Sequence, residues 1–399
     1  MRKLDSVDQG RLTGAWPAVM VALVFLVALN LRPSLTTVGP LLPQLEREVG
    51  LSEALQGLLG SVPLLAFALV SPLVHHLSKR FGMERAILIA LLALVAGVAV
   101  RSFTGDAGLW LGTALLGSAI AVGNVLVPTL VKRDYSAHIS RATGIYSACI
   151  NIGASLAAAA AVPLAVQFGW RGSMAFWAIP ALVVAVLWLP RTRVFDPEPE
   201  LSGDAGTALT SVWRQPTAWL LTAFMGLQST TFYLMVTWLP TVEIAAGISE
   251  RQAGWHLFVF QIVGIFSALA APRLLRRADS QVGAAVTVSI PMLIGALGLL
   301  VLPQLGLLWA IVAGLGSGGA LVVALSLISL RGRTHSETTQ LSGMAQSLGY
   351  LLAAVGPVLA GYLAQRTGSW YASLAALGVF AALQLVIAIP VGRVRQPIR

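Results

Sequence analysis

The sequence has 399 residues, of which 57% are hydrophobic and 11% are charged, and its mean hydropathy is +0.81. Because soluble globular proteins carry roughly 25% charged residues, this composition excludes an ordinary soluble protein and predicts one that lies mostly in lipid. The net charge of +10 could suit nucleic acid, but the basic residues are dispersed in short loops, which argues against nucleic-acid binding.

Twelve apolar runs separated by short polar segments fill the chain, and a helix needs about 20 such residues to cross the hydrocarbon core. The sequence therefore predicts an all-α integral membrane protein with twelve transmembrane helices. The first run is too long for a signal peptide, so we expect it to remain as the first helix. In chain order the runs are Ala15–Pro40, Ala54–Leu77, Ala86–Val100, Leu109–Val131, Thr143–Val166, Ser173–Leu189, Thr217–Pro240, Ala253–Pro272, Gly283–Leu302, Leu307–Leu330, Leu341–Leu363 and Tyr371–Val391.

Positive charge is distributed unevenly between the alternate loops of this topology. If the N-terminus is cytoplasmic, twenty of the 26 Lys and Arg residues fall in cytoplasmic segments. The positive-inside rule then predicts a multi-pass protein of the inner (plasma) membrane with both termini in the cytoplasm. Arg32 falls inside the first run, and the outer loops hold only Arg47, Arg101, Arg171, Arg251 and Arg366.

An internal repeat divides the chain into two halves. Residues 50–57 (Gly-Leu-Ser-Glu-Ala-Leu-Gln-Gly) recur at 247–254 as Gly-Ile-Ser-Glu-Arg-Gln-Ala-Gly, an offset of 197 residues, and Gly169 matches Gly368 at an offset of 199. Each octet predicts a turn in which Gly ends one element and Ser caps the next helix. Two parallel six-helix halves place a substrate site at their interface.

We therefore expect an N-terminal six-helix bundle at residues 1–189, a flexible cytoplasmic linker at 190–216 and a C-terminal six-helix bundle at 217–399. No segment has the length or pattern of a separate soluble domain, and no Walker-type glycine loop is present. These features argue against an ATP-driven pump and against an enzyme. The single cysteine, Cys149, offers neither a disulfide nor a metal site, and we expect no metal and no cofactor.

Arg32 is the one charged residue expected deep in the bilayer. The repeat offset places it opposite Ser229, in the middle of the seventh run. All sixteen acidic residues are expected in loops, in termini or at the edges of runs, so no partner for Arg32 is visible. An unpaired arginine at mid-membrane costs roughly 2.5 to 3.5 kcal/mol, which favours a water-filled cavity and an anion-binding role. The alternative is a helix that ends near Pro33, with the guanidinium reaching the outer interface.

Other polar residues inside the runs are candidate substrate contacts, although each is equally well explained as an interhelical hydrogen bond. His256 is also a candidate proton carrier, and Trp238 and Trp255 could form a lid at the outer turn of the second half. The candidate binding residues besides Arg32 are Asn30, Thr36, Asn124, Asn151, Gln228, Tyr233, His256, Gln261, Gln346 and Tyr350.

Three motifs resemble a known group: Asn30-Leu-Arg-Pro33, Gly39-Pro-Leu-Leu-Pro-Gln-Leu45 and Pro128-Thr-Leu-Val-Lys-Arg133. Together, over essentially the whole chain, they resemble the cyanate and 2-nitroimidazole transporter branch of the major facilitator superfamily. The superfamily loop after the second helix is partly kept in Arg80, Gly82 and Arg85, whereas its usual Asp is Lys79. The resemblance implies alternating access by rocking of the halves and small anionic or polarised substrates.

The sequence thus predicts a secondary active transporter, not an enzyme, that moves a cyanate-like anion or a 2-nitroimidazole-like molecule and acts as a monomer in the lipid bilayer. Protons are a candidate coupling ion. A proton-coupled multidrug exporter is the alternative, for which an intramembrane acidic residue would be expected. A membrane-embedded sensor is the alternative from another class.

Overall fold

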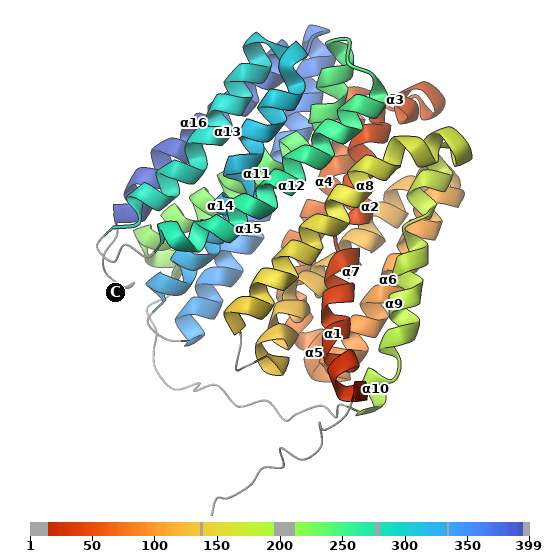
Figure 1. Ribbon diagram of the computed structural model, residues 1–399, viewed down its shortest axis with the longest axis vertical. Coiled ribbons are helices and arrows are strands. Elements are labelled where there is room, and N and C mark those ends of the chain that lie inside the picture. Colours follow the sequence, from red (N-terminus) through yellow and green to blue (C-terminus); the bar gives the residue numbers. More distant parts are fainter. Residues whose placement is uncertain (1–14, 136–138, 195–211, 276–279, 333–334, 394–399) are drawn as a thin grey trace, which may run out of the picture.

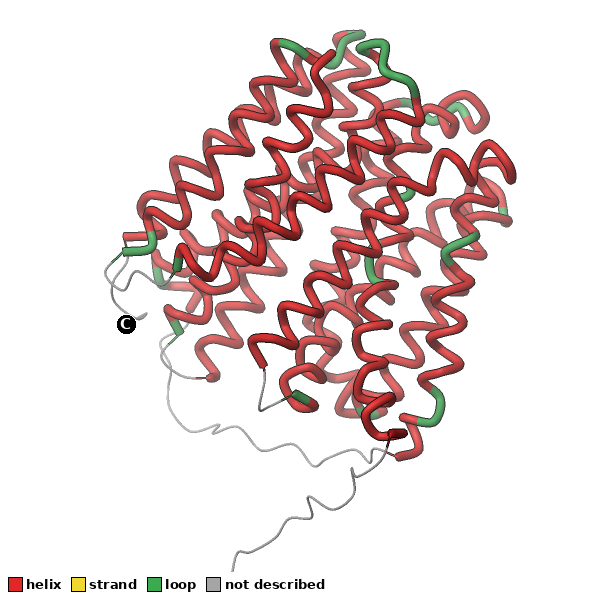
Figure 2. The backbone as a smooth tube through the Cα atoms, in the orientation of Figure 1, coloured by secondary structure: helices red, strands yellow, loops and turns green. Residues whose placement is uncertain are grey.

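The computed structural model describes residues 15–135, 139–194, 212–275, 280–332 and 335–393. Within these residues every regular element is helical, as expected from the apolar runs, and short loops connect the helices (Figure 2). The first half contains α1 (Ala15–Asn30), α2 (Pro33–Thr36), α3 (Val38–Val49), α4 (Glu53–Val70), η2 (Ser71–Leu73), α5 (Val74–Phe81), α6 (Met83–Phe103), α7 (Gly105–Asp134), α8 (Ile139–Ala175), α9 (Ala178–Trp188) and α10 (Arg191–Val194). The second half contains η4 (Val212–Arg214), α11 (Pro216–Ala245), α12 (Glu250–Leu274), α13 (Val282–Val301), η5 (Pro303–Leu305), α14 (Gly306–Arg331), α15 (His335–Thr367) and α16 (Tyr371–Arg393).

Eleven continuous stretches are long and apolar enough to cross a membrane. The longest, Ala142–Arg193, has 52 residues, which as one straight helix would reach about 78 Å, more than twice the hydrocarbon core. The chain turns within it at Gly169, where φ is 70° and ψ is 169°. This stretch therefore supplies the predicted fifth and sixth crossings, and the expected total of twelve agrees with the structure.

The two halves lie side by side, with the red-to-yellow first half packed against the green-to-blue second half (Figure 1). We call the end of the bundle where α1 begins and α16 ends the terminal end, and the opposite end, which carries the Gly50 and Gly247 turns, the distal end. Two helix pairs make the largest contacts between halves, α4 with α15 and α8 with α12. Of the predicted linker, residues 195–211 lie outside the described part of the chain, and its division from the two bundles stays a prediction.

The repeat seen in the sequence is also a repeat of backbone conformation. Gly50 and Gly247 have φ values of 70° and 93°, and Gly169 and Gly368 have 70° and 63°. Only glycine adopts this left-handed region readily, so each pair marks the same sharp turn in both halves. Ser249 caps α12 as predicted by accepting a hydrogen bond from the Gln252 amide, whereas the side chain of Ser52 makes no such bond at the start of α4.

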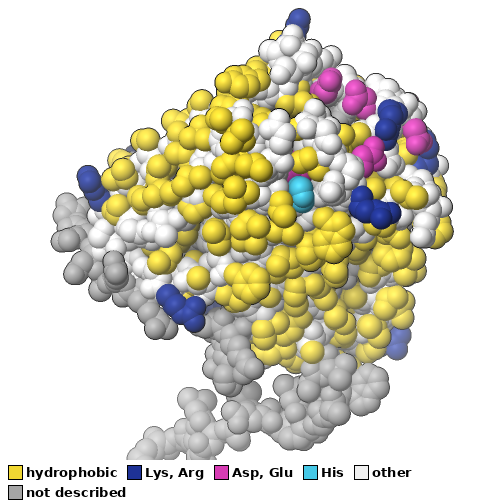
Figure 3. Space-filling view, turned by 45° about the horizontal axis from the view of Figure 1, so that its top comes forward, with side chains coloured by type: hydrophobic (Ala, Val, Ile, Leu, Met, Phe, Trp, Pro, Cys, Tyr) yellow, Lys and Arg dark blue, Asp and Glu magenta, His cyan; other side chains and the backbone are white. Residues whose placement is uncertain are grey.

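Apolar side chains cover much of the surface. Leu69, Val166 and Val301 are among the large hydrophobic residues that are exposed, and Figure 3 shows a broad hydrophobic area with charged side chains gathered toward its margins. In water such an area would be unfavourable, whereas lipid tails solvate it. The exposed face is thus the lipid-facing face of a multi-pass membrane protein.

Candidate functional site

Arg32 lies at a break in the first membrane span. The first predicted run, Ala15–Pro40, is not one helix, because α1 ends at Asn30 and α2 begins at Pro33. Proline has no backbone N–H and disfavours helical conformation in the residue before it, which explains the break. Helix resumes through α3, so the span runs from Met20 to Val49 with Arg32 inside it. The helix does break before Pro33, as in that alternative, but apolar helix continues beyond the break to Val49.

The guanidinium of Arg32 is surrounded by aromatic residues from both halves. Its Nη1 donates a hydrogen bond to the hydroxyl of Tyr233, and its Cζ lies 5.4 Å from the centre of the Tyr233 ring and 5.9 Å from that of Phe232. Two further tyrosines, Tyr146 and Tyr350, lie within range of direct electrostatic interaction with it. We call this group, with Phe67, the Arg32 site.

The Arg32 site draws on four helices and on the break between α1 and α2. Its first-half members are Arg32 between α1 and α2, Phe67 on α4 and Tyr146 on α8, and its second-half members are Phe232 and Tyr233 on α11 and Tyr350 on α15. The rings of Phe67 and Tyr350 meet edge to face across the interface, 5.3 Å apart. A relative movement of the halves would therefore change the shape of the site.

The Arg32 site carries positive charge at the interface between the halves. Among the described residues no carboxylate lies within salt-bridge distance of Arg32, and its Nε is buried without a hydrogen-bond partner. Tyrosine hydroxyls and aromatic faces stabilise a guanidinium only in part. The chemistry of these groups therefore suits an anionic or strongly polarised group beside a flat ring.

Of the ten other candidate residues, Tyr233 and Tyr350 belong to the Arg32 site. Five more use their side chains near their own position in the helix. These are Asn30 (to the Leu26 carbonyl, 2.9 Å), Thr36 (to the Arg32 carbonyl, 3.2 Å), Asn151 (to the Ser147 carbonyl, 2.9 Å), Gln228 (to the Ser229 hydroxyl, 2.7 Å) and Gln346 (to the Ser342 hydroxyl, 2.8 Å).

The remaining three candidates differ from one another. The side-chain amide nitrogen of Asn124, on α7, is buried without a hydrogen-bond partner among the described residues. Gln261, on α12, donates to the Ala154 carbonyl on α8 at 3.2 Å and so bridges the halves. His256 Nδ1 lies 3.0 Å from Oε2 of Glu243, which the sequence placed beyond the seventh run but which is fully buried within α11.

Sequence reasoning missed four members of the Arg32 site and the His256–Glu243 pair: Phe67, Tyr146, Phe232 and Glu243. The three aromatic residues occur inside apolar runs, where they are indistinguishable from core side chains. Glu243 follows a Pro240 that was expected to end the seventh helix, whereas α11 continues to Ala245. The aromatic residues could be assigned only once the neighbouring helices were known, and Glu243 only once the end of α11 was known.

The distal end of the interface is tightly closed. A Cβ added to Gly57 on α4 would lie 2.2 Å from the Pro357 carbonyl oxygen on α15, and one added to Gly39 would lie 2.4 Å from that of Val236 on α11. Ser61 donates to the Ala354 carbonyl at 2.6 Å. At the rim, Arg47 Nη2 and Glu250 Oε1 are 2.7 Å apart. Glycine thus lets the halves touch backbone to backbone on this side.

Charged residues at the terminal end hold the first half together. Arg133 pairs with Glu84 at 2.6 Å and with Asp134 at 2.8 Å. Arg191, which the sequence placed in the flexible linker, is instead fully buried, pairs with Asp134 and donates to the Met20 carbonyl at 2.7 Å. Carboxylates are thus present at this end although Lys79 replaces the usual Asp.

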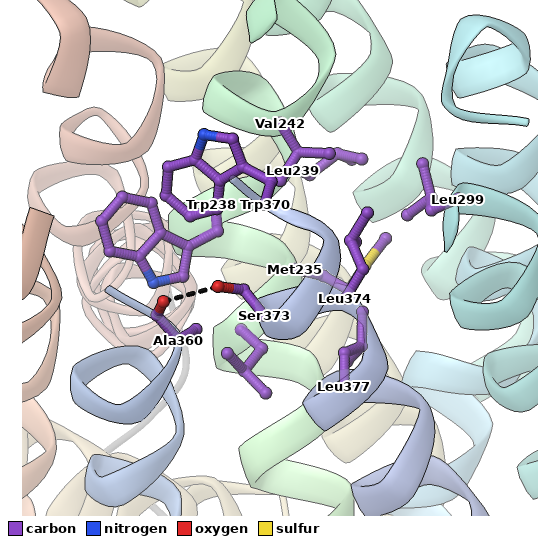
Figure 4. Close-up of a pocket in the computed structure, with 11 residues that line it drawn as sticks. Met235, Trp238, Leu239, Val242, Leu299, Ala360, Trp370, Ser373, Leu374 and Leu377 are labelled. Carbon is purple, nitrogen blue, oxygen red and sulfur yellow. Dashed lines mark hydrogen bonds between the residues drawn. The ribbon is translucent and has the colours of Figure 1, made fainter. Parts of the chain in front are cut away.

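A small apolar cavity lies within the second half (Figure 4). Trp238 and Trp370 form its edge with ring centres 4.7 Å apart, and Ser373 donates to the Ala360 carbonyl beside it. Trp238 is buried and donates to the Pro357 carbonyl at 3.0 Å, so it packs within its own half. Trp255 is exposed, which agrees with a membrane-interface position.

Comparison with known proteins agrees with this architecture. The sequence pattern of the Major Facilitator Superfamily matches residues 23–353. The chain is 38% identical over 383 residues to the 2-nitroimidazole transporter of Escherichia coli (strain K12), covering 96% of this chain and 97% of that protein. It is 31% identical over 359 residues to the cyanate transport protein CynX of the same strain, covering 88% and 91%.

Solved structures show the same fold at low sequence identity. A bacterial homologue of the human lysosomal transporter Spinster, in an inward-facing and unoccupied conformation, matches with a TM-score of 0.76 at 16% identity, covering 95% of this chain and 96% of that one. With two six-helix halves, a polar site at their interface and these relatives, the chain belongs to the major facilitator superfamily of membrane transporters, in the group that contains the 2-nitroimidazole and cyanate transporters.

Proposed function

We propose that the protein is a secondary transporter for a small planar molecule with anionic or polarised oxygens, of the nitroimidazole type, and that Arg32 is its anchor. The observation that carries this proposal is a guanidinium without a carboxylate partner, among the described residues, inside a set of aromatic rings from both halves. The fork of a guanidinium matches two oxygens of a nitro or carboxylate group, while the rings can stack on a flat heterocycle.

Cyanate is a second substrate class for the same site. It shares the negative charge that Arg32 would neutralise, and a relative that carries it is 31% identical to this chain. It has no ring to occupy the aromatic side of the site, so the geometry favours the planar heterocycle. A multidrug exporter for hydrophobic cations is disfavoured, because the positive charge of Arg32 repels cations at the interface between the halves.

Alternating access by movement of the two halves is part of the proposal. In the proposed topology both termini are cytoplasmic, so the closed distal end faces the outside. The arrangement of 20 of the 26 basic residues supports this orientation. A single chain contains both halves of the site, which supports function as a monomer.

Proton coupling forms a further part of the proposal, with the His256–Glu243 pair as the carrier. An imidazole and a carboxylate in contact can exchange a proton, and this pair lies 3.0 Å apart with His256 partly exposed. Replacement of His256 by Gln should abolish substrate-driven proton flux in proteoliposomes while substrate binding persists. Unchanged proton flux in that variant would remove the pair from the coupling mechanism.

The deciding experiment for the substrate is a binding assay on purified protein with 2-nitroimidazole, cyanate, nitrate and small carboxylates. Arg32→Gln should weaken binding of the true ligand about 10- to 100-fold, because hydrogen bonds to charged groups contribute roughly 1.5 to 3 kcal/mol. Arg32→Lys should recover only part of the affinity, since it keeps the charge and loses the fork. Arg47→Gln, which removes an exposed arginine at the distal rim, is the matched control and should bind normally. Equal binding by Arg32→Gln and wild type would overturn the proposal.

The membrane topology can be tested by cysteine labelling, because Cys149 is the only native cysteine and can be replaced. In a Cys149→Ala background, a cysteine at the exposed Ala245 of the distal end should react with an impermeant maleimide in intact cells. One at the exposed Ser280 of the terminal end should react only after the cells are permeabilised. The reverse labelling pattern would show that the distal end faces the cytoplasm.

A further inference from the structure

Arg101 is a second buried arginine, and it lies on the distal side of the interface. The sequence placed it in an outer loop, but it belongs to the last turn of α6 and is 1% exposed. A Cβ added to Gly112 on α7 would lie 2.3 Å from the Arg101 amide nitrogen, so close packing of α6 on α7 holds this turn inside the bundle.

The guanidinium of Arg101 has less hydrogen bonding than its charge requires. Nη1 donates to the Ser34 carbonyl of α2 at 2.7 Å, whereas Nε and Nη2 are buried without a partner among the described residues. No carboxylate of those residues forms a salt bridge with it. Arginine stays charged in proteins, and an isolated buried charge costs several kcal/mol, so this position calls for a counter-ion.

A small cavity adjoins Arg101 and is shared by the two halves. Ser34, Arg101 and Thr113 line it from the first half, and Tyr233 and Thr237 line it from α11 of the second. The cavity has room for about one water molecule or one monatomic ion. Its polar side chains include hydroxyl groups, which donate readily to anions.

Tyr233 connects this cavity to the Arg32 site, because its hydroxyl accepts from Arg32 while its side chain lines the cavity. Arg32 is not among the residues that line the cavity, so the two arginines belong to neighbouring but separate sites. The cavity lies where α11 approaches α2, α3 and α4 at the closed distal side, and separation of the halves would open it toward that side.

We propose that this cavity is a binding site for a small inorganic anion the size of chloride, coordinated by the free N–H groups of Arg101 and bridged to α11 by Thr237. The bound anion neutralises Arg101 and links the halves in the distal-closed state. This site goes beyond the proposed function, and it does not depend on which substrate occupies the Arg32 site.

The test is thermal unfolding of the purified protein in sodium gluconate, with chloride substituted for gluconate at constant sodium. The unfolding temperature of the wild type should rise saturably with chloride, as expected when a ligand binds only the folded state. Arg101→Gln should lose this rise, and Arg32→Gln should keep it, which separates the site from the substrate anchor. No rise in the wild type, or the same rise in Arg101→Gln, would overturn the proposal.

Two milder variants keep the test decisive if Arg101→Gln does not fold. Arg101→Lys retains the charge without the fork and should need roughly tenfold more chloride for half-saturation. Thr237→Val is nearly isosteric and removes the hydroxyl on the opposite wall, so it should also raise the half-saturating concentration. Half-saturation at the wild-type concentration in both variants would contradict the proposed coordination.

Discussion

The Nη1 of Arg32 donates a hydrogen bond to the hydroxyl of Tyr233, a residue 201 positions later in the chain and in the other half of the protein. The bond therefore crosses the interface that must rearrange during alternating access. It holds the guanidinium among the aromatic side chains of the Arg32 site, where Nε has no hydrogen-bond partner among the described residues. In the proposed function, substrate recognition and the contact between halves thus share one side chain.

Tyr233→Phe tests the importance of this bond, because it removes the hydroxyl and keeps the ring. A hydrogen bond of this kind contributes about 0.5 to 1.5 kcal/mol, so we expect substrate affinity to fall roughly 2- to 10-fold as the guanidinium loses its orientation. Equilibrium binding measures the effect. Tyr371→Phe, at an exposed position, is the control, and an equal loss there would show that the effect is not local.

Gly57→Ala should prevent closure of the distal end. The added Cβ would lie 2.2 Å from the Pro357 carbonyl oxygen, so α4 and α15 must separate and transport should fall sharply. In a Cys149→Ala background, a cysteine at the buried Val236 should then react faster with a maleimide applied from the distal side. Gly144→Ala is the matched control, since a Cβ there meets nothing within 4 Å; slow labelling in both variants would show that the closure tolerates the extra group.

The ion pair of Arg47 and Glu250 at the distal rim should make a small contribution to closure. Arg47 is 63% exposed and the pair is 2.7 Å apart, and exposed pairs contribute about 0.2 to 1 kcal/mol. Arg47→Glu should raise distal accessibility modestly, and the charge-swapped double variant Arg47→Glu/Glu250→Arg should restore it. A double-mutant cycle with no coupling would show that the pair does not contribute.

His256→Ala should destabilise the protein strongly, because it leaves the fully buried carboxylate of Glu243 without its partner. Breaking a buried pair in this way costs about 3 to 5 kcal/mol. Denaturant unfolding in detergent measures the loss. Adding Glu243→Gln to this variant removes the unpaired charge and should recover part of the stability. No recovery would show that the unpaired carboxylate of Glu243 is not the cause of the loss.

The sequence by itself determined the fold class, the number of crossings and the repeat. Lipid imposes these features locally, since each span must be long and apolar and each turn between spans needs residues such as Gly50 and Gly247 that accept a left-handed backbone. The sequence also singled out Arg32, because a charged residue inside an apolar run can be recognised without any knowledge of packing.

Only the tertiary structure decided which side chains meet Arg32. Tyr233 and Tyr350 could be named as candidates, but Tyr146 and Phe67 resemble any other aromatic residue in an apolar run, and Asn30 and Asn151 turn out to bond within their own helices. Arg101 was expected in a loop because it directly follows the third predicted run, which ends at Val100, yet packing of α6 on α7 buries it. The physical reason is that the face of a helix that meets its neighbours depends on contacts between residues far apart in the chain, which a pattern of local hydropathy does not record.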